Sequence, residues 1–290
     1  MTQVIDKLTK VSHQYRALFV DLWGCLHDGI RSFPTAVSAL ETYRSTGGIV
    51  IIVTNSPRTR VDVEKQLQHF GVSEYAWDSI ATSGDSARLA LFQGTVGQKV
   101  WTIGYPGDDE FFRPVNILRD PIAIQQVSLE QAQGIVCTGP FDPQAPPTVM
   151  KPEFNFAVRR GLKLLCANPD IVVDRGDRRE WCAGALARLY TEMGGTSLYF
   201  GKPHPPIYDL ARRRLAKIVD DIADSDILVI GDGITTDISG AVNERLDSLF
   251  VSGGLARAET KTVDQPNAQA LAKFLERQKI HPTYTIGMLR

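Results

Sequence analysis

The chain has 290 residues, of which 43% are hydrophobic and 22% are charged, the balance of a soluble globular protein with one large domain or two smaller ones. Its 32 basic and 33 acidic residues give a net charge of -1, and no run of like charge indicates a nucleic-acid arm or a polybasic membrane patch. The four cysteines, Cys25, Cys137, Cys166 and Cys182, form no C-x-x-C pair, so neither a zinc site nor a redox dithiol is indicated.

The first ten residues, MTQVIDKLTK, lack the apolar centre of a signal peptide, and the longest aliphatic run, Ile49–Val53, is too short to span a membrane. With the scattered cysteines, this predicts a cytoplasmic protein. We expect its partners to be small molecules, with no nucleic acid and no membrane among them.

Short β-branched runs alternate with helical patterns in the first part of the chain, which is typical of βαβ units around a parallel sheet. Strands are predicted in ALFVDL (17–22) and GGIVIIVTN (47–55). Helices are predicted at 35–46 and 58–70, because their apolar residues recur at helical spacing.

The middle of the chain has strands and helices of its own. Strands are predicted at 98–105, 133–140 and 162–169, and helices at 148–161 and 180–194. A segment of this size can form a small domain. We therefore predict an inserted domain at 85–192 and a core domain made of 1–84 and 193–290.

The alternation returns in the last part of the chain. We expect strands in SLYFGK (197–202), DILVIGDG (226–233), SLFVSGG (248–254) and PTYTIGML (282–289), with helices at 205–218, 235–246 and 268–278 between them. In the helix at 235–246, Ile238, Ala241, Val242 and Leu246 form one apolar stripe. The fold predicted is α/β, with a doubly wound parallel sheet between helical layers and an inserted α/β domain.

Polar residues stand where four of the predicted core strands end. They are Asp21, the pair Thr54 and Asn55, Lys202, and Asp232 with Asp237 shortly after it. Alone, each could be a turn, capping or surface residue. Ligands bind at the carboxyl ends of parallel strands, however, and three carboxylates that converge there repel one another unless a cation lies between them.

The order DLWG, VTN, GKP and GDGITTD resembles the haloacid dehalogenase superfamily of phosphohydrolases. The large insert after the second motif is similar to that of its class IIA branch, the NagD and p-nitrophenyl phosphatase type. ATSGD, ANPD and GKPHPPIYDLA also resemble segments of this branch, so the likeness extends over nearly the whole chain.

This resemblance implies a Mg²⁺-dependent phosphatase that acts on a small phosphomonoester, such as a sugar or aryl phosphate. Asp21 would be the nucleophile that forms an aspartyl-phosphate. Thr54, Asn55 and Lys202 would bind the phosphoryl group. The metal ligands would be Asp21, Asp232 and the backbone carbonyl of Trp23, with Asp237 as a further ligand or as an anchor for the others.

Two further properties follow from the resemblance. The insert would be a cap domain that closes over the site and recognises the leaving group, and Asn168 and Asp170 in ANPD are its candidate substrate contacts. Caps of this type often pair, so a homodimer formed through the cap is one expectation.

The sequence departs from the family at Trp23, where most of these phosphatases have a second Asp that serves as general acid and base. Asp28 or His27 in the same loop could replace it, although the plain interpretation of either is a turn residue. Alternatively, the enzyme is slow or restricted to activated phosphates.

Two other functions stay open. The superfamily's dehalogenases also carry an aromatic residue at this position, but they need no Mg²⁺ and so leave Asp232 and Asp237 unexplained. The protein could instead be a phospholigand-binding protein without turnover, which Trp23 favours and the nucleophile Asp21 opposes.

Overall fold

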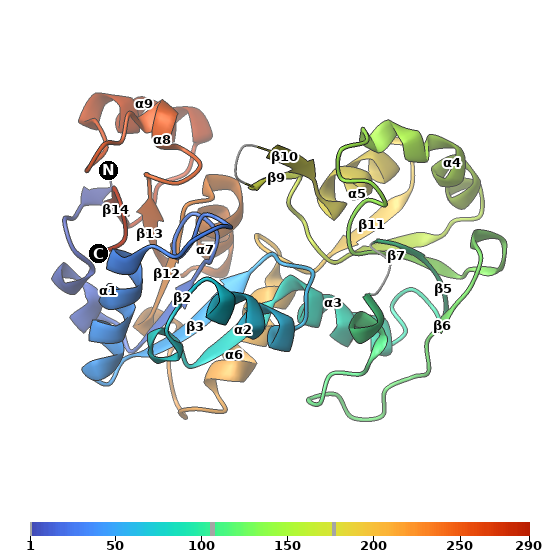
Figure 1. Cartoon of the computed structure of the whole chain (residues 1–290), viewed down its shortest axis with the longest axis horizontal. Coiled ribbons are helices and arrows are strands. Elements are labelled where there is room, and N and C mark those ends of the chain that lie inside the picture. Colours follow the sequence, from blue (N-terminus) through green and yellow to red (C-terminus); the bar gives the residue numbers. More distant parts are fainter. Residues whose placement is uncertain (1, 105–107, 176–177) are drawn as a thin grey trace. The chain divides into compact units, whose positions relative to one another are not determined.

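The computed structural model of the chain describes residues 2–104, 108–175 and 178–290. The chain divides into two compact units, and each has a sheet of its own (Figure 1). The first unit consists of Met1–Thr54, Glu64–Ala81 and Tyr208–Arg290, and the second consists of Asn55–Val63 and Thr82–Ile207.

The first unit is built on a seven-stranded sheet. Its strands are β1 (Gln3–Val4), β2 (Ala17–Val20), β3 (Ile49–Thr54), β4 (Ser79–Thr82), β12 (Ile227–Gly231), β13 (Asp247–Val251) and β14 (Tyr284–Ile286). They lie in the order β1-β14-β13-β12-β2-β3-β4, and the pairings on both sides of β2, β12, β13 and β14 are parallel. All residues of β2 and β12 are buried, as in strands covered on both faces.

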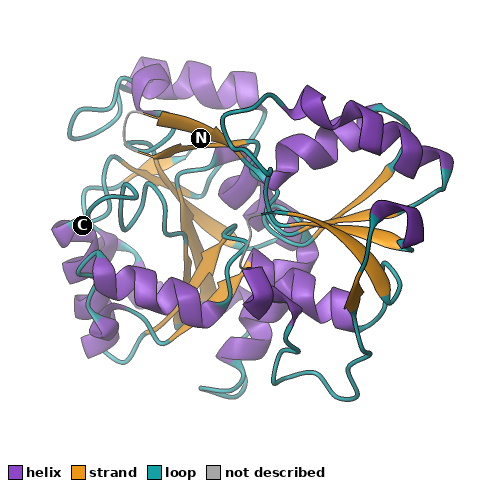
Figure 2. Ribbon diagram, turned by 45° about the vertical axis from the view of Figure 1, so that its right-hand side comes forward, coloured by secondary structure: helices purple, strands orange, loops and turns teal. Residues whose placement is uncertain are grey.

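Helices lie on both sides of these strands (Figure 2). They are α1 (Pro34–Ser45), α2 (Arg60–His69), α6 (Pro205–Leu215), α7 (Ser239–Glu244), α8 (Arg257–Thr260) and α9 (Ala268–Gln278), with a π-helical turn at Ile234–Ile238 before α7. The helix α1 buries Val37, Leu40 and Tyr43, which is the face expected from their spacing.

The second unit contains a five-stranded sheet and a two-stranded antiparallel hairpin. The sheet strands are β5 (Lys99–Ile103), β6 (Gln125–Gln126), β7 (Gly134–Cys137), β8 (Lys163–Cys166) and β11 (Thr196–Tyr199), and the hairpin strands are β9 (Val172–Arg175) and β10 (Arg178–Trp181). The helices are α3 (Ser83–Phe92), α4 (Lys151–Arg159) and α5 (Ala183–Glu192). The sheet order is β11-β8-β7-β5-β6, and its pairings are parallel.

Short 3₁₀ turns connect many of these elements. They are Leu8–Lys10, Ser12–Gln14, Glu74–Ala76, Asp108–Phe112, Leu129–Gln131, Pro147–Met150 and Asp224–Asp226.

Two parallel sheets with helices around them confirm the predicted α/β fold class. One strand was assigned to the wrong sheet, because β11, expected in the core from SLYFGK, pairs with β8 of the second unit. A four-residue apolar run does not show which sheet it joins. The boundaries proposed for the inserted domain, 85 and 192, stay predictions.

The helix at 235–246 also differs from the expectation. The π-helical turn inserts an extra residue and shifts the faces of the segment, so Val242 is 50% exposed although it was placed in the buried stripe. Ile238, Ala241 and Leu246 are buried as predicted. Within the described residues, none of the helices is both long enough and apolar enough to cross a membrane.

Candidate active site

The strand order of the first unit marks one place as the natural ligand site. From β2 the chain adds β3 and β4 on one side, and from β12 it adds β13 and β14 on the other. The order therefore reverses between β2 and β12, and in such sheets ligands bind outside the carboxyl ends of the strands at this point. Asp21 follows β2 and Asp232 follows β12, so both lie at this reversal.

Three buried side chains converge there. The carboxylate oxygens of Asp21 and Asp232 and the Sγ of Cys25 include one atom each that lies within 4.8 Å of the others. Asp21 is 7% exposed, Asp232 4% and Cys25 1%. Two ionised carboxylates this close and this buried oppose each other's charge, and a divalent cation between them relieves that repulsion.

The backbone around Asp232 leaves just enough room for its carboxylate. A Cβ on Gly24 would lie 2.1 Å from Asp232 Oδ2, and one on Gly254 would lie 2.0 Å from the same atom. The N–H of Leu255 donates a hydrogen bond of 2.8 Å to this oxygen. Oxygen donors held in a glycine-lined space fit the hard divalent cation that the sequence predicts, Mg²⁺, with Asp21 and Asp232 as its ligands.

Asp237 lies behind this cluster and is not one of its three converging groups. Its Oδ2 accepts hydrogen bonds from the N–H of Gly233, at 3.1 Å, and from the hydroxyl of Thr236, at 3.3 Å. The side chain is 2% exposed and packs so close to Gly231 that a Cβ there would lie 2.1 Å from its Cγ. These contacts fix the turn after β12, which fits the anchoring role; direct metal ligation by Asp237 stays a prediction.

The loop after Asp21 is organised by aromatic packing. The half-buried ring of Trp23 lies edge-on to the ring of His27, with centroids 5.3 Å apart. The ring of Phe70 also packs against the ring of His27, with centroids 4.9 Å apart. A Cβ on Gly29 would be 2.4 Å from the Trp23 ring, so Gly29 both adopts its positive φ of 84° and makes room for the indole.

His27 is held as a neutral ring in this packing. Its Nδ1 accepts a hydrogen bond of 3.0 Å from the N–H of Gly29, and its Nε2 is buried without a hydrogen-bond partner. Burial lowers its pKa to about 4, and the nearby Asp28 carboxylate only partly opposes this effect. At neutral pH the ring is therefore neutral, and its remaining N–H, on Nε2, is too weak an acid to protonate a leaving group.

Asp28 makes the contacts of a turn residue. Its Oδ1 accepts hydrogen bonds from the N–H groups of Ile30, at 3.0 Å, and Arg31, at 2.9 Å. Slight burial raises its pKa, but the N–H groups of Arg31 and Ile30 and the charge of Arg31 outweigh that effect, so the pKa lies below its usual value. A general acid needs a raised pKa, so these contacts disfavour Asp28 as the replacement for the missing Asp.

Thr54 ends β3 beside the same reversal point. Because Val20 pairs with Ile52 in parallel register, Asp21 and Thr54 leave adjacent strands at the same edge of the sheet. Thr54 is 6% exposed. Asp21, Thr54 and Asp232 therefore lie at this edge of the sheet, and Asp237 fixes the turn that follows Asp232.

Four predicted residues, Asn55, Asn168, Asp170 and Lys202, lie in the second unit, where Asn55 connects Lys202 with Asp170. The side-chain Oδ1 of Asn55 accepts a hydrogen bond of 2.7 Å from the N–H of Lys202. Its Nδ2 donates to the carbonyl of Lys202, at 3.2 Å, and to Asp170 Oδ1, at 2.8 Å. The Asn55 side chain therefore positions the backbone of Lys202, a role that the sequence had not indicated.

Neighbouring residues complete this second cluster. The Oδ1 of Asn168 accepts a hydrogen bond of 2.9 Å from the N–H of Asp170. Lys202 is 2% exposed and so is not the solvated surface lysine it could have been. A Cβ on Gly201 would meet Asn55, Pro169 and Ser83 at 2.5 to 2.6 Å, so the backbone before Lys202 approaches all three closely.

His204, close to Lys202, has a structural environment. Its ring stacks on that of Tyr199, with centroids 5.0 Å apart and planes 11° from parallel. Burial lowers its pKa. Its backbone N–H also donates to the carbonyl of Gly201, at 2.9 Å, so the contacts of His204 are those of a turn residue.

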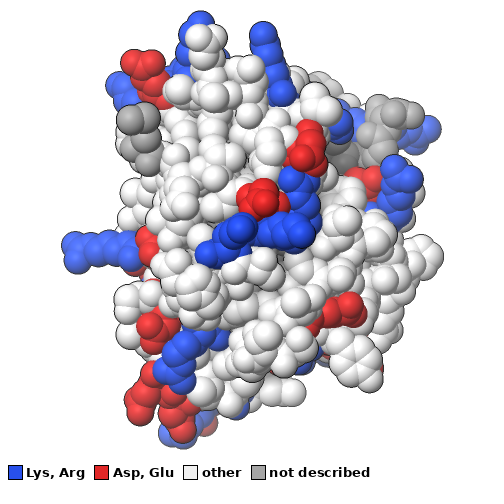
Figure 3. Space-filling model, turned by 90° about the vertical axis from the view of Figure 1, so that its left-hand side faces the viewer, with Lys and Arg blue, Asp and Glu red and all other residues white. Residues whose placement is uncertain are grey.

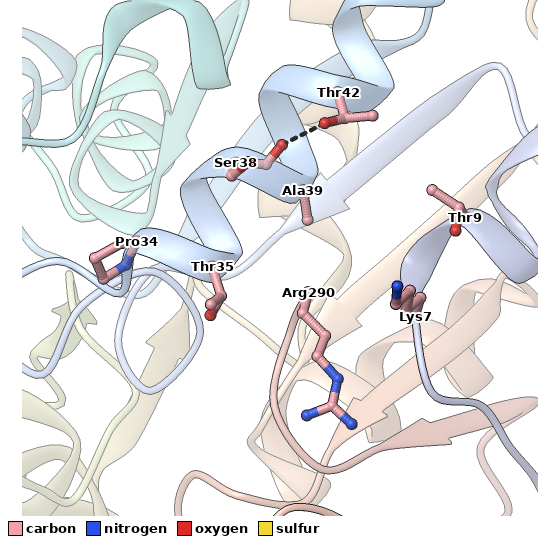
Figure 4. A pocket seen from close by; sticks show the side chains of 8 residues that line it. All are labelled: Lys7, Thr9, Pro34, Thr35, Ser38, Ala39, Thr42 and Arg290. Carbon is pink, nitrogen blue, oxygen red and sulfur yellow. Dashed lines mark hydrogen bonds between the residues drawn. The ribbon is translucent and has the colours of Figure 1, made fainter.

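A separate open pocket of about 400 Å³ lies between α1 and the two ends of the chain (Figure 4). Lys7, Thr35, Ser38 and Arg290 are among the residues that line it. Arg290 is already paired with Asp264 and donates to the carbonyl of Asp6. This pocket brings no acid and base together and is not a candidate active site.

Cys25 is the functional candidate that the sequence did not indicate. It was considered only for C-x-x-C pairing, and its separation of four residues from Asp21 was the available signal. The turn returns this residue toward Asp21, because the N–H of Leu26 bonds to the carbonyl of Leu22 at 2.8 Å.

Two family profiles match parts of this chain. A family profile described as haloacid dehalogenase-like hydrolase matches residues 18–117, and one described as HAD-hydrolase-like matches residues 199–277. The solved structure of a haloacid dehalogenase-like family hydrolase from Brucella suis 1330 is 35% identical, covers 99% of this chain and 100% of its own, and has a TM-score of 0.85.

Phosphatases are among the more distant relatives. An acid sugar phosphatase from Staphylococcus saprophyticus is 23% identical in an alignment 287 residues long that covers 93% of this chain and 94% of its own. A glycerol phosphate phosphatase from Mycobacterium tuberculosis, solved in complex with magnesium, is 24% identical, covers 97% of this chain and 77% of its own, and has a TM-score of 0.71.

The chain belongs to the haloacid dehalogenase-like hydrolases, because the relative from Brucella suis matches almost its whole length. A p-nitrophenyl phosphatase from Archaeoglobus fulgidus, the type named by the expected class IIA branch, has the same fold, with 21% identity, 95% coverage of this chain, 97% of its own and a TM-score of 0.72. The predicted family, and with it the prediction of an enzyme of the phosphohydrolase type, are confirmed.

Proposed function

We propose that the protein is a Mg²⁺-dependent phosphatase that hydrolyses a small phosphomonoester through an aspartyl-phosphate on Asp21. The observation that carries the proposal is the convergence of the buried carboxylates of Asp21 and Asp232 at the reversal point of the sheet. The magnesium complex of the related glycerol phosphate phosphatase supports the choice of metal.

Each residue then has a defined task. A carboxylate oxygen of Asp21 attacks phosphorus, the bond from phosphorus to the leaving oxygen breaks, and water later releases phosphate from Asp21. The Thr54 hydroxyl donates to a phosphoryl oxygen, and Lys202 balances the negative charge. Mg²⁺, held by Asp21, Asp232 and the carbonyl of Trp23, would supply charge neutralisation and in-line alignment.

Trp23 defines which phosphates are good substrates. An indole cannot protonate a leaving oxygen, His27 is held neutral, and Asp28 is held ionised. Positioned acid catalysis typically contributes about 10² to 10⁴ in rate. We therefore propose that aryl and acyl phosphates, whose leaving groups need no proton, are hydrolysed faster than sugar phosphates.

The second candidate function is that of a phospholigand-binding protein without turnover. It is favoured by the packing of Trp23 against His27 and Gly29, which builds a rigid loop with no proton donor. A haloacid dehalogenase ranks below both, since it has no use for the buried carboxylate of Asp232.

The proposal extends to the cellular setting and the partners. We propose a cytoplasmic enzyme whose partner is a small phosphorylated metabolite, with no nucleic acid and no membrane as partner and with a homodimer formed through the insert as its assembly. On the face drawn in Figure 3, basic and acidic side chains are intermixed, which is compatible with that view.

The test is phosphate release from aryl, acyl and sugar phosphates, with Mg²⁺ and with EDTA, for the wild type beside Asp21→Asn. Asp209→Asn, an exposed carboxylate on α6, is the matched control. Mg²⁺-dependent release that is lost only in Asp21→Asn supports the phosphatase. No release, with phosphate or a phosphate analogue still bound, supports the binding protein, and halide release from haloacids supports the dehalogenase.

A further inference from the structure

We infer that Cys25, Asp21 and Asp232 form a site for a thiophilic divalent cation such as Zn²⁺ or Cd²⁺. This site shares both carboxylates with the proposed Mg²⁺ site, so the two metals exclude each other. The binding of the thiophilic cation stands on the cluster alone, whereas its consequence, inhibition of the enzyme, rests on the proposed function.

The geometry of the cluster supplies the ligands. One oxygen of each carboxylate and the Cys25 Sγ lie within 4.8 Å of one another, so a single ion placed among them can reach all three after small shifts. Zinc sites that keep a position open for water or substrate commonly have three protein ligands at about 2.0 to 2.3 Å. The three side chains here match that number and that kind of donor.

The site is pre-arranged by the backbone as well as by the three ligands. Asp232 is oriented by the N–H of Leu255. Gly24 and Gly254 leave the space that their absent side chains would fill. The turn from Leu22 to Leu26 keeps Cys25 buried beside Asp21. These features do not depend on the thiol and would also serve a cation bound by oxygen alone.

The thiol decides which cation binds most tightly. Oxygen ligands suit Mg²⁺, whereas a thiolate favours Zn²⁺ and other soft ions. On binding, the Sγ–H bond of Cys25 breaks, its proton passes to buffer, and the sulfur donates its electron pair to the metal. No oxidation or reduction takes place.

Other cysteines of the chain offer a control. Cys137 is fully buried in the second unit, burial raises its pKa to about 12, and its thiol donates to the carbonyl of Gly139. Among the described residues, Cys137 belongs to no group of three side chains that could hold a metal ion, whereas Cys25 does. Cys137→Ser therefore changes a buried cysteine without changing the proposed site.

The experiment uses Co²⁺ as a spectroscopic probe on the full chain. A sulfur-to-cobalt charge-transfer band in the near ultraviolet is expected for the wild type and for Cys137→Ser, and its loss is expected for Cys25→Ser. Titration calorimetry should show Zn²⁺ binding weakened roughly tenfold or more in Cys25→Ser, and Mg²⁺ binding by a much smaller factor. Cys25→Val, also checked by circular dichroism, should lose the band in the same way and covers a folding failure of the serine variant.

Absence of the band in the folded wild type would overturn the inference, as would a band or an unchanged Zn²⁺ affinity in folded Cys25→Ser or Cys25→Val. Loss of the band in Cys137→Ser alone would overturn it too. None of these readouts needs turnover. A cobalt–sulfur band in a protein that releases no phosphate would therefore support this inference and contradict the proposed function. Phosphate release from a protein without the band would support the proposed function and contradict this inference.

Discussion

The two clusters of polar side chains in this molecule are built on opposite physical principles. In the first unit, Asp21 and Asp232 bring negative charge together with Cys25, in a space kept open by glycines. In the second unit, the amide of Asn55 bonds to Asp170 and to both backbone groups of Lys202.

The first cluster is therefore suited to binding a ligand, whereas the second stabilises the fold. Converging carboxylates gain from a cation supplied from outside, so substitutions there should act first on metal binding and turnover. An amide that already makes its hydrogen bonds within the protein contributes to stability, and removing it leaves buried donors and acceptors without partners. Each variant below tests this contrast.

The largest effect is expected for Asp21→Asn. The amide is a much weaker nucleophile than the carboxylate, so the rate of phosphate release should fall by about 10³-fold or more. Steady-state release from an aryl phosphate measures this, beside Asp209→Asn. A loss of less than tenfold would remove Asp21 from the role of nucleophile.

A smaller effect on the same cluster is expected from Gly24→Ala. The new methyl group would stand 2.1 Å from Asp232 Oδ2, so the carboxylate must shift, and Mg²⁺ affinity should fall roughly tenfold or more. Gly71→Ala is the matched control, because its φ of 72° is close to the 78° of Gly24 and nothing lies within 4 Å of its Cβ.

The measurement is the increase in melting temperature that Mg²⁺ produces, since a bound ligand stabilises the folded state by mass action. Both variants should lose stability without metal, by about 1 to 2 kcal/mol, because both place a Cβ in the left-handed region. Only Gly24→Ala should also lose the Mg²⁺-dependent increase. Equal behaviour of the two would show that the space beside Asp232 is not a metal site.

In the second cluster, Asn55→Asp should destabilise the fold by about 1 to 3 kcal/mol. The change keeps the acceptor for the Lys202 N–H but sets a second carboxylate against Asp170 and removes the donor to the Lys202 carbonyl. Adding Asp170→Asn returns a donor to the pair and should recover part of the loss. Urea denaturation of both single variants and the double variant gives the coupling energy.

If the double variant loses as much stability as the two single variants added together, Asn55 acts by packing alone. Recovery would establish the hydrogen bond between Asn55 and Asp170 as the organising contact of this cluster.

Much of the first cluster could be predicted from the sequence, because strand ends and parallel pairing are local properties. The apolar runs before Asp21, Thr54 and Asp232 determine where the strands stop, and parallel alignment brings their carboxyl ends to one edge. Strand ends and parallel pairing do not predict the position of Cys25, because that position depends on how the turn from Leu22 to Leu26 folds back.

The second cluster could be predicted only in part, because its contacts join residues far apart in the chain. Asn55 and Lys202 are separated by 147 residues, and their bonds run from an amide to backbone groups, which no spacing reveals. The sheet assignment of β11 failed for the same reason, since strand pairing is decided by tertiary contacts.

The smallest effect is expected for Asp28→Asn, which tests whether the first unit contains a substitute general acid. Asparagine can accept the same two N–H bonds from Ile30 and Arg31, so the turn should persist. If Asp28 is a turn residue, activity should change by less than about threefold, whereas loss of a general acid would cost about 10² or more.

The pH dependence of stability gives an independent reading of Asp28. Its folded pKa lies below its usual value, so the ionised carboxylate stabilises the fold above the unfolded pKa, and this contribution is lost as the pH falls through the folded pKa. The difference in urea midpoint between wild type and Asp28→Asn should therefore be largest near neutral pH and shrink on acidification. A difference that instead grew toward acid would mean a raised pKa, and Asp28 would again be a candidate for the proton donor that Trp23 cannot be.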